Sequence, residues 1–328
     1  MKLLVLALIF LPMLAGCLSF HAGAMPGEPK DATFANVRSG GQSVRVRYVD
    51  RGKTTSPVVV LIHGFASSLD AWNAVMPALE KRGFRVIAID LKGFGWTDRP
   101  EGDYSPDAQA KLVYALLDQR GVQNASIVAH SWGSSVALAA ALQQPDRVNR
   151  LALYDAWIYE EQLPTFFHWA RADGIGETMF ALWYKERPDD KIVQAFYDPK
   201  YVTEKLVEEV EAALDRPGTV AAALAAVRGQ RYAALQSKYR TIKKPTLLLW
   251  GREDVVTPLR FGERLSREMP HAKLLVYPQC GHFPMIEALS ASNEDLVDFL
   301  EPELRDAAPQ QSSAAAAPAN HDLDREGP

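Results

Sequence analysis

The chain has 328 residues, of which 48% are hydrophobic and 23% charged, and its formal net charge at pH 7 is −4. This length suits one large globular core with an insertion, and the small negative charge excludes a general attraction to nucleic acid. Cys17 and Cys280 are the only cysteines, which excludes a disulfide framework, and neither has a metal-ligand spacing. The sequence therefore implies no metal and no nucleotide cofactor.

The first 17 residues are typical of an export signal. Lys2 precedes the apolar run Leu3–Leu11, which is too short for a stable membrane span. The run leads into Leu14-Ala15-Gly16-Cys17, which resembles the lipobox of bacterial lipoproteins. That resemblance implies a lipoprotein signal peptide over residues 1–17, lipidation of Cys17 and a membrane partner in the cell envelope. Leu18 stands where aspartate would favour inner-membrane retention, so the outer membrane is favoured by analogy.

An ordinary secretory signal is the alternative. Ala22-Gly23-Ala24 offers a cleavage site after which a soluble secreted or periplasmic protein would begin at Met25. We interpret residues 18–34 as a linker. At the other end, residues 306–328 are rich in Gln, Ser, Ala and Pro and are predicted to be a disordered tail, because they cannot bury enough apolar surface to offset ordering.

Between these ends, strand and helix patterns alternate. Short, nearly continuous apolar runs are typical of buried parallel strands and occur at Val58–Ile62, Arg85–Ile89, Ser126–Ala129, Leu151–Tyr154, Thr246–Trp250 and Lys273–Tyr277. Helical periodicity separates several of them, at Ala71–Lys81, Pro106–Gln119 and Ser134–Gln143. Val44–Val49 alternates apolar with polar residues and is predicted to be an antiparallel edge strand. The pattern indicates a mostly parallel sheet with helices on both faces.

The alternation stops over residues 157–239, which show helical patterns and no convincing strand. An all-helical insertion between two strands must lie outside the sheet, so we expect a cap over the strand ends. The cap is rich in aromatic residues, which favours an apolar acyl or aryl group in the site below, although most of them are expected to be packing. The core is then assigned to residues 35–156 and 240–302.

A serine follows the strand Ser126–Ala129, in the sequence His130-Ser131-Trp132-Gly133, and a small-residue helix begins directly after it. A serine on a sharp strand-to-helix turn has an exposed hydroxyl and has N–H groups at the helix start that can stabilise negative charge. Ser131 is therefore the candidate nucleophile, with Gly133 as the small residue that lets strand and helix pass closely. We expect the neighbouring His130 to point away from the reaction.

The strand Val58–Ile62 leads into His63-Gly64-Phe65. A backbone N–H of this loop and that of the residue after the nucleophile are the expected oxyanion hole, which assigns Phe65 and Trp132. His63 and Gly64 are predicted to be structural. Asp90, which begins a glycine-rich loop, is predicted to shape that loop through local hydrogen bonds.

Two titratable side chains follow the last two predicted strands. Asp254 lies in the loop after Thr246–Trp250, and His282 lies in the loop after Lys273–Tyr277, so both are expected at the same sheet edge as Ser131. His282 would take the serine proton, and an aspartate would fix its tautomer. Asp155 also ends a strand, so it stays open as the alternative acid.

Together these motifs, with Gly251 and Gly281-His282, resemble the α/β-hydrolase superfamily over about residues 35–302. The resemblance implies the fold, the chain order serine, acid, histidine, and a small-molecule substrate. Serine at position 131 argues against the members that use an aspartate nucleophile. The resulting prediction is a carboxylic ester hydrolase that forms an acyl-enzyme. Cleavage of an amide or a carbon–carbon bond is the nearest alternative, and a non-catalytic surface lipoprotein that binds lipid or a partner is the alternative from another class.

Overall fold

The computed structural model describes residues 18–307 of the chain and is built around one eight-stranded sheet. The spatial order is β1-β2-β4-β3-β5-β6-β7-β8. The pairs β1–β2 and β2–β4 are antiparallel, and all other neighbours, from β4 to β8, are parallel. The strands are β1 Thr33–Ser39, β2 Gln42–Arg51, β3 Val58–Ile62, β4 Arg85–Ile89, β5 Ala125–His130, β6 Val148–Tyr154, β7 Thr246–Gly251 and β8 Ala272–Tyr277. The predicted α/β class with a mostly parallel sheet is confirmed.

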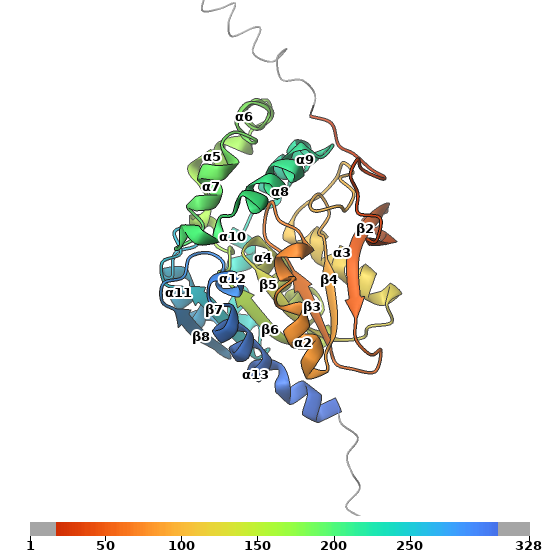
Figure 1. Ribbon diagram of the computed structural model, residues 1–328, viewed down its shortest axis with the longest axis vertical. Helices are drawn as coiled ribbons and strands as arrows, with labels where there is room; N and C mark the ends of the chain where they lie inside the picture. The colour runs from red at the N-terminus through yellow and green to blue at the C-terminus, as the bar shows by residue number, and fades with distance from the viewer. Residues whose placement is uncertain (1–17, 308–328) are drawn as a thin grey trace, which may run out of the picture.

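Helices cover both faces of this sheet (Figure 1). In β3, Val60 and Ile62 belong to one buried cluster and Val59 and Leu61 to another, because successive side chains of a strand point to opposite faces. The first cluster includes side chains from α3 Pro106–Gln119, α4 Trp132–Gln143 and α11 Arg260–Glu268. The second includes side chains from α2 Met76–Arg82, α12 Pro284–Glu287 and α13 Leu289–Ala307. Burial on both faces explains the continuous apolar runs.

Two predicted elements differ from the structure. The strand predicted over Val44–Val49 is part of β2, and it is not at the edge, because β1 pairs along its outer side. The helix predicted over Ala71–Lys81 is divided into a 3₁₀ turn at Leu69–Trp72 and the helix α2. Pro77 lies in the first turn of α2, where its missing N–H costs least, so the chain restarts a helix there.

The segment predicted as a linker, residues 18–34, is packed against the fold. Leu18 and Phe20 lie against the core, Met25 is 4% exposed, and His21 forms an isolated antiparallel bridge with Arg99. Apolar side chains too sparse to predict an element can still dock on a surface that the rest of the chain provides. The predicted signal peptide and Cys17 lie outside the described residues, as does the tail after residue 307.

The residues between β6 and β7 form helices, with no strand in that described segment. The helices are α5 Thr165–Ala170, α6 Ile175–Trp183, α7 Pro188–Val193, α8 Glu204–Asp215, α9 Thr219–Gly229 and α10 Ala233–Gln236. Figure 1 shows them gathered at one end of the molecule, with α13 reaching the opposite end. Because β6 and β7 are parallel neighbours, this insertion starts at the carboxyl edge of the sheet and forms a cap there.

Candidate active site

Ser131 occupies the sharp turn between β5 and α4. Its backbone has φ 51° and ψ −124°, a conformation that costs on the order of 1–3 kcal/mol for a residue with a side chain. A hydrogen bond from its N–H to the Tyr154 carbonyl of β6, at 2.9 Å, holds the turn. Two residues on, a Cβ at Gly133 would overlap the carbonyl oxygen of His63, so α4 passes β3 as closely as the predicted motif requires.

Three side chains from separate loops form a hydrogen-bonded line at the carboxyl edge of the sheet. His282 Nε2 lies 3.0 Å from Ser131 Oγ, and His282 Nδ1 lies 2.8 Å from Asp254 Oδ2. Each of the three residues is no more than 5% exposed. Parallel strands end at one edge, which is why residues more than a hundred positions apart meet here. The structure thus brings together the three residues that the sequence predicted as nucleophile, base and acid.

The Asp254 carboxylate is surrounded by donors. Oδ1 accepts the N–H groups of Val256 at 2.7 Å and Thr257 at 3.0 Å, and Oδ2 accepts the Thr257 hydroxyl at 2.5 Å. Burial opposes ionisation, but the facing His282 and these hydrogen bonds outweigh it and hold the pKa of Asp254 well below its usual range. Asp254 is therefore an anion against the imidazole, which fixes Nδ1 as the protonated nitrogen.

Asp155, the alternative acid, lies beside this pair and does not bond His282. Its Oδ1 accepts the Gly251 N–H at 3.0 Å, whereas its buried Oδ2 has no hydrogen-bond partner among the described residues. Burial, and next the negative charge of Asp254, raise the pKa of Asp155 well above its usual range. Two carboxyls this close beside one imidazole cannot both ionise, so Asp155 holds a proton that it can donate to Asp254.

Carboxylate and imidazole atoms of Asp155, Asp254 and His282 all lie within 4.8 Å of one another, a spacing that a metal ion could also use. However, Nδ1 of His282 and Oδ2 of Asp254 are already joined, and Asp155 is the neutral partner of the pair. Two of the three candidate ligands are therefore bonded to each other, and this arrangement fits a proton-transfer line better than a metal centre.

The loop after β3 lies directly against the nucleophile. A Cβ on Gly64 would come within 3.0 Å of both Ser131 Cβ and His130 Nδ1, so the small residue predicted there is needed for the approach. The backbones of Phe65 and Trp132, the two predicted oxyanion donors, therefore flank Ser131. Within residues 18–307 neither of their N–H groups is hydrogen-bonded to a protein acceptor, which leaves both free to bind an oxygen of a substrate.

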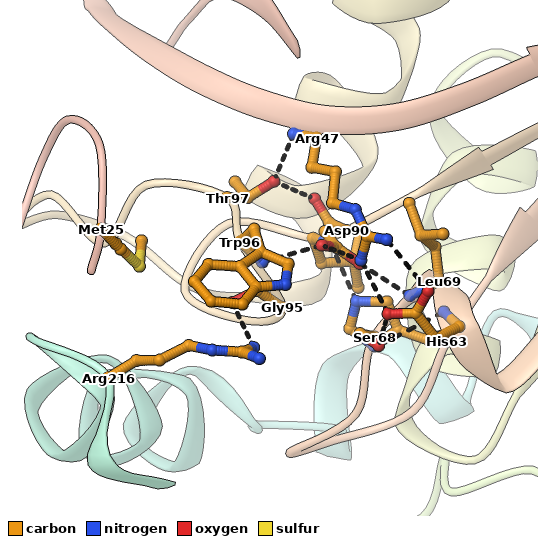
Figure 2. Close-up of polar contacts among 12 residues, drawn as sticks. Met25, Arg47, His63, Ser68, Leu69, Asp90, Gly95, Trp96, Thr97 and Arg216 are labelled. Atoms are coloured by element: carbon orange, nitrogen blue, oxygen red, sulfur yellow. Dashed lines mark hydrogen bonds and ion pairs between the residues drawn. The ribbon is translucent and has the colours of Figure 1, made fainter. Parts of the chain in front are cut away.

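His63 and Asp90 fix the loops on either side. His63 Nε2 accepts the Leu91 N–H at 3.0 Å, so Nδ1 carries the proton that it donates to the Gly64 carbonyl at 2.7 Å. Asp90 accepts the N–H of Leu69 at 2.6 Å and that of Trp96 at 2.8 Å, and Figure 2 shows these bonds converging on one buried carboxylate. Both contacts agree with the structural roles expected from the sequence.

The ion pair of Asp90 was not expected. Arg47, from β2, lies 3.5 Å from Asp90 and 2.7 Å from Asp70, and Figure 2 shows its side chain extending toward Asp90. A Cβ on Gly95 would overlap the Asp90 carboxylate, and φ at Gly95 is 53°, so only glycine lets the loop wrap this closely. The network joins the antiparallel strand to the loops beside the site.

His130 differs from its prediction. Rather than pointing away, its ring packs against His282 with 4.7 Å between centroids, and its Nε2 lies 2.8 Å from the His282 carbonyl oxygen. A carbonyl only accepts, so Nε2 carries the proton. Burial and the neighbouring His282 lower the pKa of His130 well below its usual range. His130 is thus a neutral brace behind His282, and no sequence pattern marks that role.

Sequence reasoning also missed Thr257 and Glu287. The Thr257 hydroxyl donates to Asp254 and lies 3.4 Å from His282 Nδ1. The Glu287 carboxylate accepts the N–H groups of Gly281 at 2.8 Å and of Tyr197 at 2.8 Å, which ties the histidine loop to the cap. His282 N–H also donates to the Ala195 carbonyl at 2.7 Å. Of these two residues, only Thr257 could have been predicted from the sequence, because its hydroxyl lies in the same loop as Asp254, three residues further on.

Aromatic rings from the core and the cap meet above the nucleophile. The Phe65 ring packs against Phe94 and Trp132 of the core, and against Phe167 of α5 and Tyr184 at the end of α6. Trp157 stacks on Phe167 at 6.0 Å between centroids. The expectation of an apolar roof therefore applies to this group, while Phe166, Trp169, Trp183 and Tyr197 are exposed and do not line the site.

The chain matches the family model described as alpha/beta hydrolase fold over residues 57–198 and 208–289, more than half its length. It is 30% identical over 285 residues to a 2-hydroxy-6-oxononadienedioate/2-hydroxy-6-oxononatrienedioate hydrolase of Paraburkholderia phymatum, covering 83% of this chain and 96% of that one. The protein therefore belongs to the α/β-hydrolase family.

Solved structures agree with this assignment. A crystal structure of the meta-cleavage product hydrolase CumD has a TM-score of 0.67 and 31% identity, covering 82% of this chain and 98% of that one. A thermophilic esterase from Thermogutta terrifontis has a TM-score of 0.69 and 23% identity, covering 84% and 99%, and this likeness concerns the fold alone.

Proposed function

We propose that the protein is a serine hydrolase that works through an acyl-enzyme on Ser131. The observation that carries the proposal is the hydrogen-bonded line from Ser131 Oγ to His282 Nε2 at 3.0 Å and from His282 Nδ1 to Asp254 at 2.8 Å. A nucleophile, a base within reach of its proton, and an acid that orients the base are the parts that nucleophilic catalysis requires.

Each proton has a defined place in the reaction. His282 Nε2 takes the Ser131 proton as Oγ attacks the substrate carbonyl, and the ionised Asp254 stabilises the imidazolium that forms. The Phe65 and Trp132 N–H groups hold the oxyanion. His282 then gives the proton to the leaving group, which departs and leaves the acyl chain on Oγ. Water, deprotonated by the same histidine, releases the acid and restores Ser131.

The site favours a carboxylic ester with an apolar acyl group. The rings around Phe65 supply an apolar wall, and within residues 18–307 no lysine or arginine is hydrogen-bonded or ion-paired to Ser131, His282 or Asp254. An apolar wall, with no cation bonded to these three residues, suits a neutral acyl group better than an anionic one.

Carbon–carbon bond hydrolysis is the second candidate, and the relatives favour it. The Paraburkholderia phymatum relative is named as a hydrolase of 2-hydroxy-6-oxononadienedioate and CumD as a meta-cleavage product hydrolase, and the chain covers nearly the whole length of each. The same triad can serve this reaction, because the oxyanion hole and the histidine act on any carbonyl whose leaving group can accept a proton.

A fluorophosphonate probe tests the nucleophile, with Ser131→Ala and His282→Ala as matched variants. Labelling of the wild type and its loss in both variants is the expected result. Equal labelling in all three, or none in the wild type, would leave the alternative of a non-catalytic surface protein. Short and medium acyl esters, aminoacyl anilides and 2-hydroxy-6-oxo-dienoates then separate the substrate classes, and turnover of the dienoates alone would replace the ester proposal.

We also propose that Cys17 is lipidated and holds the protein in the bacterial cell envelope, at the outer membrane. No helix of the described residues is long and apolar enough to cross a membrane. The packing of residues 18–25 supports processing at Cys17, because cleavage after Ala24 would remove the bridge between His21 and Arg99. Incorporation of radiolabelled palmitate that is lost in Cys17→Ser is the expected result, and a soluble product starting at Met25 would contradict it.

A further inference from the structure

We propose that the outer face of the cap is a membrane-contact surface that rests on a zwitterionic phospholipid bilayer. Eight large apolar side chains are exposed on the described chain, and seven belong to the cap between residues 166 and 197. We call these seven the cap patch: Phe166, Trp169, Ile175, Leu182, Trp183, Val193 and Tyr197. Monomeric soluble proteins seldom gather so many exposed apolar side chains in one segment unless it binds something.

The exposed face of α6 is distinct from the face that builds the cap. Gly176 and Phe180 are buried, and Gly176 lies so close to the Ala170 carbonyl of α5 that a Cβ would overlap it. Ile175 and Leu182 are seven residues apart, so they share another stripe of the helix, and they are 53% and 57% exposed. Trp183, the last residue of α6, is 58% exposed. The cap thus has a complete inner packing without them, and its core does not explain why they are apolar.

The composition of the patch favours a lipid interface. Tryptophan and tyrosine, represented here by Trp169, Trp183 and Tyr197, are enriched where a membrane meets water, because their apolar rings carry a polar N–H or O–H. Two of the cations nearby are paired with carboxylates: Lys185 with Asp215 at 2.9 Å, and Arg187 with Asp190. A third, Lys191, donates to the Trp183 and Tyr184 carbonyls. A patch with apolar rings and with cations already bonded within the cap should bind a zwitterionic bilayer and should not depend on anionic lipid.

The start of the described chain lies at the same end of the molecule. Leu18 lines a groove of about 620 Å³ together with Glu177 of α6 and with Leu224 and Arg228 of α9. Figure 1 shows the first described residues beside α9, and α13 at the far end. Cys17 is bonded to Leu18, so the acyl anchor proposed above would enter the bilayer beside the cap, and this orientation rests on that proposal. The anchor would therefore hold the bilayer next to the cap patch, which makes the bilayer the partner that this surface contacts.

The test uses the full chain with vesicles of phosphatidylcholine whose acyl chains carry bromine, which quenches tryptophan at short range. Trp169 and Trp183 are 61% and 58% exposed and should be quenched when the vesicles are added. The double variant Ile175→Ser and Leu182→Ser keeps both tryptophans and should weaken vesicle binding about tenfold. Val255→Ser is the matched control, because Val255 is 68% exposed but follows strand β7 and lies outside the cap. This variant should bind vesicles like the wild type.

Cys17→Ser separates the cap contact from the anchor. In this variant, flotation at low lipid should fall, while quenching at high lipid persists because the patch is unchanged. Unaltered flotation in Cys17→Ser would refute the anchor and leave the cap contact standing. Three results would overturn the cap contact: no quenching in vesicle-bound wild type, binding that requires anionic lipid and disappears in salt, or a wild-type dimer that the double variant converts to monomer.

Discussion

The pairing of Asp155 with Asp254 predicts how stability changes with pH. Asp155 keeps its proton in the folded protein because burial and Asp254 raise its pKa, whereas in the unfolded chain it ionises at about pH 3.9. Above that pH the folded state binds one more proton than the unfolded state, so this group makes stability fall as pH rises. While the folded carboxyl stays protonated, each pH unit costs about 1.4 kcal/mol.

Asp155→Asn removes this titration and keeps the shape. The amide oxygen can still accept the Gly251 N–H, and the amide nitrogen carries hydrogens where the protonated acid carries one. Relative to the wild type, we expect the variant to gain stability progressively above about pH 4, by about 2–4 °C in Tm for each pH unit. Below that pH the gain should vanish.

Thermal unfolding of both proteins at pH 4, 5, 6 and 7 measures the difference. The control is Asp31→Asn, which makes the same chemical change at an exposed aspartate outside this pair. A flat profile for Asp155→Asn, or a loss of stability that grows with pH, would mean that Asp155 is ionised in the folded protein and would refute the reasoning.

Three further predictions concern the site and its supports. Asp254→Asn should lower kcat by about 10³- to 10⁴-fold with little change in KM, because the ion that fixes the His282 tautomer is lost; a loss below tenfold in steady-state assays would return the acid role to Asp155. Gly95→Ala should lower the free energy of unfolding by about 3 kcal/mol or more, because a Cβ there meets the Asp90 carboxylate. Urea unfolding measures this loss, and a midpoint equal to that of the wild type would contradict the close packing. Glu287→Ala should lower the free energy of unfolding by about 2–3 kcal/mol and should lower kcat, because the Gly281 and Tyr197 N–H groups lose their acceptor. Glu287→Gln keeps an acceptor oxygen and should have a smaller effect. Identical unfolding and rates for the two variants would contradict the role of Glu287 in joining the histidine loop to the cap.

The cap shows where sequence reasoning reached its limit. Helical periodicity correctly indicated helices after β6, but the same pattern gave no way to tell Phe167, which lies over Phe65, from Phe166, which is exposed. Both are aromatic and adjacent in one short helix. Which of the two neighbours points inward depends on how that helix is rotated against the core. The hydrophobic pattern of so short a helix does not determine this rotation.

The strands and the three hydrogen-bonded residues were accessible from sequence for a common reason. Strands buried on both faces must be apolar throughout, and the loops that follow them must carry the polar groups, so Ser131, Asp254 and His282 stand out at the ends of apolar runs. By itself the sequence thus indicated the mostly parallel layered sheet and the edge at which these residues gather, but it missed β1, which pairs along the outer side of β2.

Only the tertiary structure decided how the neighbouring groups divide their tasks. Asp155 and Asp254 both end strands, yet one bonds His282 and the other is protonated beside it; His130, expected to point away, braces His282 from behind. The physical reason is that hydrogen bonding and ionisation are set by distances of a few ångströms between segments remote in the chain. Local residue patterns fix the type of each segment, but not those distances.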